Sequence, residues 1–148
     1  MDKNNIFYEG QVLWAQLDPN RHLRHSAYAD FGAQARINML SASGLSANEL
    51  AKQNIGPILF REELFYHREI GLNDKIYVTV ELTKYHVKKH RFSFRHVIYR
   101  ADGVKAATIL IDGAWLDLVE RKLTTIPEEW NAKIQQVPKA EDYIEVSE

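Results

Sequence analysis

The chain has 148 residues, of which 45% are hydrophobic and 26% charged, the composition of an ordinary soluble domain. Its formal net charge of -1 gives no general attraction to nucleic acids or anionic membranes. The absence of cysteine excludes disulfides, thiolate zinc sites and a cysteine nucleophile. No apolar run approaches a membrane span and the first residues do not form a signal peptide, so we expect a cytoplasmic protein without membrane insertion.

The first half of the chain predicts one strand followed by two helices. Loose alternation of apolar side chains indicates a strand over residues 6–17. A long helix is expected over residues 26–43, with Ser26 as its N-cap and Gly44 directly after its end. A capping box at residues 46–49 then starts a short second helix.

After this second helix the apolar period changes from helical to alternating, which predicts a series of strands. Four further strands joined by tight turns are expected, over residues 58–69, 76–83, 87–100 and 104–119. A short helix begins near Pro127, and the polar tail from about residue 135 is expected to be loosely ordered. This order predicts one α+β domain of residues 1–148, in which a five-stranded antiparallel sheet wraps around a long central helix.

The segment that enters the long helix carries the most informative set of polar side chains. It is Asp18-Pro19-Asn20-Arg21-His22-Leu23-Arg24-His25-Ser26-Ala27-Tyr28. A carboxylate here would lie beside the free N–H groups of a helix N-terminus, which can stabilise a developing oxyanion. Taken alone, the segment is better explained as an ordinary polar turn before a helix.

Together with the order of elements, this segment resembles the hotdog fold, and specifically acyl-CoA thioesterases of the 4-hydroxybenzoyl-CoA thioesterase type. The resemblance covers most of the chain, from about residue 8 to residue 130. It is most specific at Asp18, His22 and Tyr28, which match the family's acid, a frequent histidine and the tyrosine that opens the helix.

The chain also departs from the family's pattern at several positions. Arg21 stands where a glycine is common, and Arg24-His25 replaces a frequent Asn-Asn pair. In the helix, Gln34 occupies the place of a glutamate. Further on, Lys88-Lys89-His90 replaces a basic residue followed by serine or threonine.

The resemblance implies hydrolysis of an acyl-CoA thioester, with CoA as part of the substrate and no further cofactor. Asp18 would be the general base or the nucleophile, and the N–H of His25 would polarise the thioester carbonyl. Substrate contacts are expected from His22, from the helix residues Tyr28 and Phe31, from the partner's second strand (Phe65, Tyr66, His67), and from a basic cluster of Lys88, Lys89 and Arg91.

Alternatives remain for two of these groups. His22 and His25 are also spaced as a metal pair, but no third ligand motif accompanies them, so no metal site is expected. The basic cluster suits the phosphates of CoA, yet it would equally protect a solvated strand edge. Nucleic acid is not expected as its partner, because the net charge is near zero and no aromatic stacking motif is present.

The resemblance further implies a homodimer or a homotetramer, because one such sheet leaves an edge free and the family's active sites lie between subunits. The main alternative function is a non-catalytic acyl-CoA binding or interaction module on the same fold. Another enzyme of this fold, a hydratase or dehydratase, fits less well because its loop pattern is absent. The acyl group, and the choice between acyl-CoA and acyl carrier protein, stay open.

Overall fold

The computed structural model describes residues 3–147. In chain order the elements are η1 (Lys3–Asn5), β1 (Ile6–Gln11), η2 (Trp14–Gln16), α1 (His25–Ala42), α2 (Ala47–Gln53), β2 (Ile55–Tyr66), β3 (Lys75–Thr79), β4 (Glu81–His86), β5 (Phe92–Arg100), β6 (Lys105–Asp117), β7 (Lys122–Thr124), α3 (Glu128–Ile134) and β8 (Lys139–Val146).

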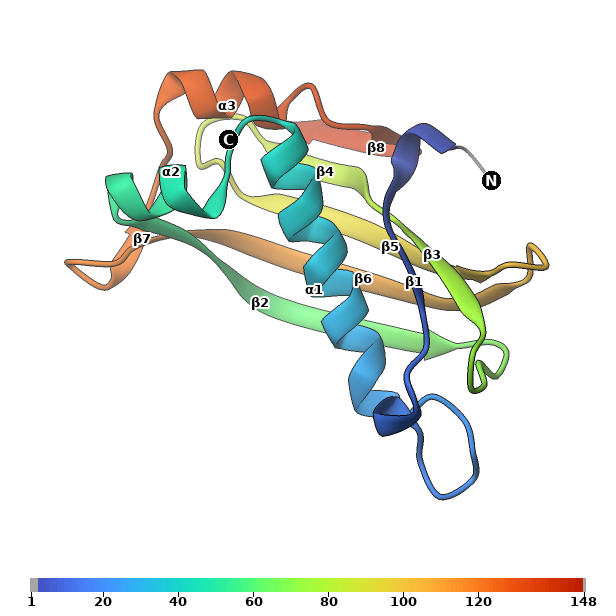
Figure 1. Cartoon of the computed structure of the whole chain (residues 1–148). Coiled ribbons are helices and arrows are strands. Elements are labelled where there is room, and N and C mark those ends of the chain that lie inside the picture. The colour runs from blue at the N-terminus through green and yellow to red at the C-terminus, as the bar shows by residue number, and fades with distance from the viewer. Residues whose placement is uncertain (1–2, 148) are drawn as a thin grey trace.

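The strands form one curved sheet of eight strands that wraps around α1 (Figure 1). Its centre is β6, which pairs with β2 on one side and with β5 on the other. Beyond β5 lie β3 and β4, followed by β1 and β8 at the far edge. Within residues 3–147, β2 pairs with β6 alone, so the twelve-residue strand β2 forms an edge of the sheet.

The central helix packs against the concave face through a mixture of large and small side chains. A β-carbon on Gly32 would lie 3.0 Å from Cδ1 of Ile109 in β6, so glycine allows a close approach of helix and sheet. At the end of the helix Gly44 has φ +89°, as its expected place after the C-terminus requires. A curved, mainly antiparallel sheet around one long helix is the hotdog fold, which confirms the expected fold class, although the sheet has eight strands and not the five expected.

Four predicted strands differ from the observed ones. The first, expected over residues 6–17, ends at Gln11 and is followed by η2, and the second, expected over 58–69, is β2 at residues 55–66. The segment 76–83 is divided at Val80, whose N–H donates to the carbonyl of Asn5, so β3 and β4 are separate strands. The alternation itself is confirmed, since Ile76, Val78, Val80 and Leu82 are all buried. The prediction of a strand over 87–100 is wrong at its start: Val87–Lys89 form a turn and β5 begins at Phe92.

The loosely ordered tail expected from about residue 135 is also a wrong prediction. Residues after α3 form β8, which pairs with β4 in parallel, the one parallel pair among the described strands. Val137 and Ala140 are buried, and Asp142 accepts two hydrogen bonds from Arg95 at 2.7 and 3.2 Å. The tail has a polar composition because an edge strand exposes most of its side chains. The polar composition of this segment therefore did not indicate that it forms the strand β8.

No helix within residues 3–147 has both the length and the apolar character needed to cross a bilayer.

Gly113 provides a test of how tightly the middle of the sheet is packed. A β-carbon there would lie 2.5 Å from the carbonyl oxygen of Ile58 and 2.6 Å from the ring of Phe92, whereas one on Gly56 would meet Leu118 at an ordinary 3.5 Å. We expect Gly113→Ala to lower the free energy of unfolding by about 1–3 kcal/mol. Urea denaturation measures this, with Gly56→Ala as the control. Equal midpoints for the two variants would contradict the packing described.

Candidate active site

The loop between η2 and α1 is a compact, hydrogen-bonded turn that protrudes beside the start of the helix (Figure 1). Leu17 and Leu23 form an isolated antiparallel bridge across it. Inside the bridge, the N–H of Asp18 donates to the carbonyl of His22 at 2.8 Å, and the N–H of Arg21 donates to the carbonyl of Asp18 at 3.0 Å. The backbone therefore fixes the place of Asp18 relative to α1.

Arg21 occupies the position at which the family pattern has a glycine. Its φ is +66°, in the left-handed region that glycine adopts without steric cost. The chain thus keeps the backbone conformation of a glycine turn with a different residue.

The carboxylate of Asp18 is held by the turn that follows it. Its Oδ1 atom accepts the N–H of Asn20 at 2.8 Å and the N–H of His22 at 3.1 Å. These bonds orient the carboxylate, and they are also what an ordinary turn-forming aspartate makes. The role of Asp18 is therefore decided by what else surrounds it.

Asp18 lies in an open cleft of ≈ 300 Å³ between this loop, the start of α1 and the end of β2. The cleft is lined by Asp18, His22, Leu23, His25, Tyr28, Tyr66, His67, Arg68 and Glu69. The two sides are joined by backbone bonds: His22 bridges Gly71, and the N–H of Leu23 donates to the carbonyl of Ile70 at 2.7 Å. Nε2 of His22 consequently lies 2.8 Å from the Glu69 carboxylate.

Tyr28 forms the inner wall of the cleft. It is buried, and its ring meets that of Tyr66 edge-on with centroids 5.0 Å apart. Burial, followed by the nearby Tyr66 and the charge of Asp18, raises the pKa of Tyr28. The hydroxyl therefore stays protonated at neutral pH and can donate a hydrogen bond.

The N-terminus of α1 lies at the cleft with no side chain capping it. The expected N-cap, Ser26, is wrong: the helix begins at His25 and its N-cap is Arg24, whose side chain makes no capping bond. The Arg24 guanidinium donates instead to the carbonyl of Ala15 at 2.7 Å. The N–H of Ala27 already donates to the carbonyl of Arg24 at 3.0 Å. The N–H groups of His25 and Ser26 precede it and have no intrahelical acceptor, so they and the positive end of the helix dipole can face an incoming carbonyl oxygen.

The structure brings together six of the residues that the sequence analysis selected. They are Asp18, His22, His25, Tyr28, Tyr66 and His67. Tyr66 and His67 were expected from the partner's second strand, whereas here they come from the last residue of the chain's own β2 and the residue that follows it. Local sequence did not show this arrangement, because it depends on the bridge between His22 and Gly71, two residues that are far apart in the sequence.

Phe31 and Phe65, expected as substrate contacts, do not line this cleft. Phe31 is buried in the core, with its ring 5.5 Å from that of Tyr8. Phe65 is exposed and points to the opposite face of β2 from Tyr66, because successive side chains of a strand alternate.

The basic cluster also lies outside the cleft. Lys88 and Lys89 are in the turn after β4, not on a strand, and the guanidinium of Arg91 lies 5.6 Å from the centroid of the Phe60 ring. Phe60 precedes Tyr66 by six residues of β2, which corresponds to about 20 Å. Within one chain these cations are therefore remote from Asp18.

Sequence analysis did not select Glu69, Arg68 or Leu23, which complete the cleft. One feature of the sequence could have indicated Glu69: it is a carboxylate located between the end of a predicted strand and the turn at Gly71. Its partner His22 becomes visible only when the two loops meet.

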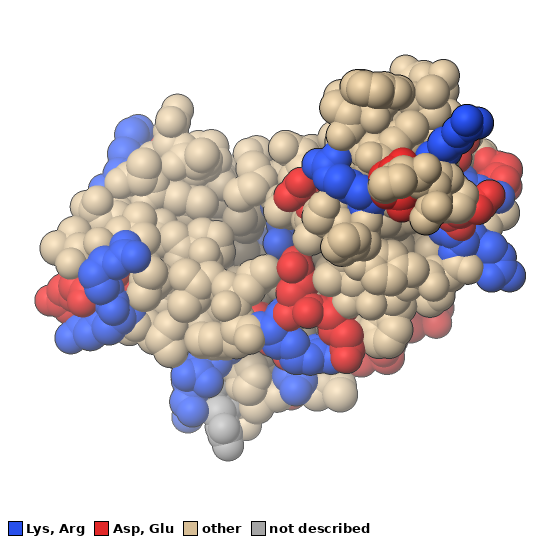
Figure 2. Space-filling view, turned by 90° about the horizontal axis from the view of Figure 1, so that it is seen from below, with Lys and Arg blue, Asp and Glu red and all other residues tan. Residues whose placement is uncertain are grey.

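Charges on the side of the molecule seen from below are of both signs. Figure 2 shows acidic and basic side chains interleaved across this face rather than a field of one sign. Within residues 3–147 no group of three or more His, Asp or Glu side chains could hold a metal ion.

Comparison with known proteins agrees with the fold. A Staphylococcus aureus protein solved in complex with CoA is similar over 91% of this chain and 87% of its own, with a TM-score of 0.83 at 20% identity. A 1,4-dihydroxy-2-naphthoyl-CoA thioesterase from Synechocystis gives 0.77 at 21% identity over 88% and 95% of the two chains. A DHNA-CoA thioesterase from Staphylococcus aureus gives 0.80 at 21% identity over 96% and 97%.

No curated protein sequence matches the chain at a significant level. The sequence profile of the Thioesterase-like superfamily, however, matches residues 12–134, which include the Asp18 loop, the central helix and strands β2 to β7. The chain therefore belongs to the thioesterase-like superfamily.

Proposed function

We propose that the protein hydrolyses an acyl-CoA thioester to the free acid and CoA at the Asp18 cleft. The observation that carries the proposal is a carboxylate oriented by two backbone N–H groups beside the uncapped N-terminus of α1, in a chain of the thioesterase-like superfamily. The CoA complex and the CoA-thioesterase descriptions among the similar structures support CoA as part of the substrate.

Two routes use the same geometry. In the first, Asp18 takes a proton from water, the oxygen attacks the carbonyl carbon, and the carbon–sulfur bond breaks to release the CoA thiolate, which is then protonated. In the second, an Asp18 oxygen attacks and displaces the thiolate, and water hydrolyses the resulting anhydride. In both, the N–H of His25 stabilises the developing oxyanion. A single turnover in ¹⁸O water identifies the second route when water attacks the Asp18 carboxyl carbon of the anhydride, because ¹⁸O then stays in Asp18; attack at the acyl carbon places ¹⁸O in the released acid in both routes.

Asp18→Asn tests the charge of this side chain. The amide oxygen can still accept the two backbone bonds, but it can neither take a proton nor attack the thioester. We expect kcat for acyl-CoA hydrolysis to fall roughly 10²–10⁴-fold, measured by thiol release from short, long and aromatic acyl-CoAs.

Asp117→Asn is the matched control, because Oδ1 of Asp117 likewise accepts two backbone N–H groups, from Val119 and Glu120, in a turn outside the cleft. Its activity should equal that of the unmodified protein. An Asp18→Asn protein with normal kcat would reject Asp18 as the reacting group. If no thioester is cleaved by the unmodified protein while CoA binds tightly, the non-catalytic binding module is the better description.

We also propose that the protein works as a homodimer paired through β2. The edge strand exposes Leu59, Phe60 and Phe65 at 39%, 53% and 43% of their surfaces, and a long apolar edge strand is unfavourable unless it is covered. Pairing β2 with a second copy about a two-fold axis would extend the sheet and cover these side chains.

The dimer predicts a particle of twice the 17.2 kDa chain mass in light scattering or sedimentation, or twice that again for a tetramer of two such dimers. Phe60→Lys combined with Phe65→Lys should shift it toward the monomer, because two cations would face each other across the edge. Val119→Lys changes an equally apolar side chain in the turn after β6 and should leave the mass unchanged. A monomeric unmodified protein would contradict the proposal.

The basic cluster is proposed to bind the nucleotide phosphates of CoA across this dimer. Two-fold antiparallel pairing of β2 brings the Ile55 end of one strand toward the Tyr66 end of its partner. The partner's copy of the turn at Lys88 and Lys89 would thereby approach the Asp18 cleft, from which it is remote in one chain.

Lys88→Glu with Lys89→Glu should therefore raise KM for acyl-CoA more than it lowers kcat, because phosphate attraction is lost without change to the reacting groups. Raising the salt concentration should reduce the difference in KM between this variant and the unmodified protein. Lys52→Glu with Lys105→Glu makes the same charge change elsewhere and serves as the control. An unaltered KM for the first pair would rule out this role.

A further inference from the structure

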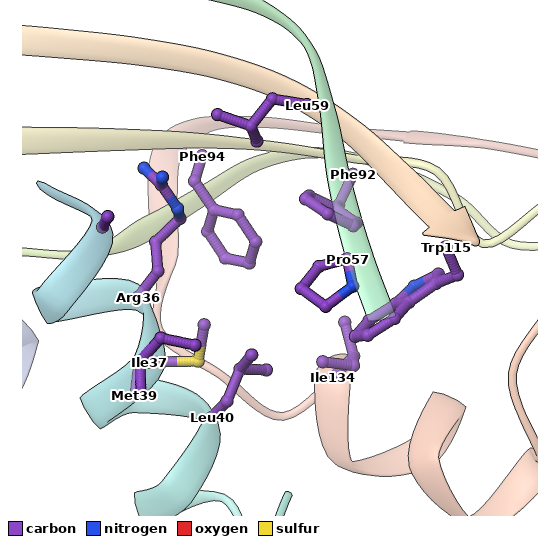
Figure 3. A pocket seen from close by; sticks show the side chains of 11 residues that line it. Arg36, Ile37, Met39, Leu40, Pro57, Leu59, Phe92, Phe94, Trp115 and Ile134 are labelled. Carbon is purple, nitrogen blue, oxygen red and sulfur yellow. The ribbon is translucent and has the colours of Figure 1, made fainter. Parts of the chain in front are cut away.

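A second cavity lies on the same side of the sheet as the Asp18 cleft, between the second half of α1, the start of β2 and α3 (Figure 3). Its volume is ≈ 150 Å³, and it shares no lining residue with the cleft. Met39, Leu40, Pro57, Phe94, Trp115 and Ile134 supply most of its wall. Apart from the Arg36 guanidinium and the indole N–H of Trp115, which is buried without a hydrogen-bond partner among the described residues, the lining side chains carry no nitrogen or oxygen atom.

Arg36 reaches from α1 along one side of this cavity, toward Phe94 and Leu59 (Figure 3). Its Nη1 atom lies 2.8 Å from Nε2 of His96, whose Nδ1 lies 3.0 Å from the carbonyl of Thr79. A carbonyl can only accept, so Nδ1 of His96 carries the proton and Nε2 accepts from Arg36. Burial and then the charge of Arg36 lower the pKa of His96 to about 3, so the imidazole is neutral.

The guanidinium therefore has a neutral hydrogen-bond partner and no ion-pair partner. Within residues 3–147 no carboxylate oxygen lies within 4.0 Å of Arg36. The charge of Glu62, on β2, acts to raise the pKa of Arg36, but burial has the larger effect and lowers it. A cation drawn into an apolar wall without its own anion is unfavourable, and a ligand carboxylate would relieve this cost.

We propose that this cavity binds a medium-chain carboxylic acid, with its carboxylate on Arg36 and its alkyl chain against Met39, Leu40, Trp115 and Ile134. One guanidinium matches one planar carboxylate, which it can bind through two parallel hydrogen bonds. A cavity of about 150 Å³ holds a guest the size of benzene, so a chain of about six to eight carbons fills it and extends to its mouth.

The site differs from the Asp18 cleft in both character and chemistry. The cleft is open and lined by groups that can react or form hydrogen bonds, whereas the cavity offers one cation in an apolar enclosure. A free acid is also the class of product that the proposed hydrolysis would release. Binding in the cavity nevertheless does not depend on that activity, and it is tested without any thioester.

Octanoate is the probe, and calorimetry with the full chain measures its affinity. Trp115 lines the cavity and is 1% exposed, so its fluorescence reports the same event. We expect saturable binding that Asp18→Asn leaves unchanged. Arg36→Met should lower the affinity for octanoate roughly tenfold to a hundredfold, because the carboxylate loses a charged hydrogen-bonding partner. The affinity for octan-1-ol should stay near its original value.

Two variants that leave Arg36 in place keep the test valid if Arg36→Met does not fold. Glu62→Gln removes an exposed negative charge that competes with the ligand carboxylate for Arg36. It should raise the affinity for octanoate but not the affinity for octan-1-ol. Ala33→Leu places three more carbons into the cavity wall and should weaken both ligands. The proposal is overturned if the unmodified protein binds no octanoate, if Glu62→Gln leaves its affinity unaltered, or if Asp18→Asn abolishes it.

Discussion

Packing of α1 against the concave face of the sheet is the constraint on which the rest of the molecule depends. Gly32 allows the helix to lie close to β6 and the small Ala35 is fully buried, while Asn38 ties the helix to the edge strand β1 by donating to the carbonyl of Phe7 at 2.7 Å. This contact fixes both ends of one rigid rod. Its N-terminus is held at the Asp18 loop, and its second half forms a wall of the apolar cavity.

The N-terminus and the second half of α1 lie in different electrostatic environments. At the start of the helix, uncapped N–H groups, the Asp18 carboxylate and three histidines surround an open cleft. Arg36 lies eight residues after Tyr28, which is about 12 Å along the helix. There it is surrounded by apolar side chains and lies beside the neutral imidazole of His96. The same helix thus directs the positive end of its dipole toward the Asp18 cleft at its N-terminus and places an isolated cation at the apolar cavity in its second half.

Much of the fold could be predicted because it is written in short-range patterns. The alternation of Ile76, Val78, Val80 and Leu82 marks an inward face whether or not the strand is interrupted, and the sequence pattern could not show the interruption because it depends on a bond from Val80 to distant Asn5. The turn at Val87–Lys89 and the strand β8 were missed for a related reason. Each is stabilised by pairing partners elsewhere in the chain, and its own composition is ambiguous.

The sequence by itself determined the class of fold, the position of Asp18 before the central helix and the tyrosine that follows it, because these depend on periodicity, turn residues and local spacing. Only the tertiary structure decided which side chains share the cleft. It brought the chain's own Tyr66, His67 and Glu69 to Asp18 and left Phe31 in the core. It also isolated Arg36 from carboxylates within the described residues. These outcomes depend on contacts between segments far apart in the chain, whose geometry is set only when the helix packs on the sheet.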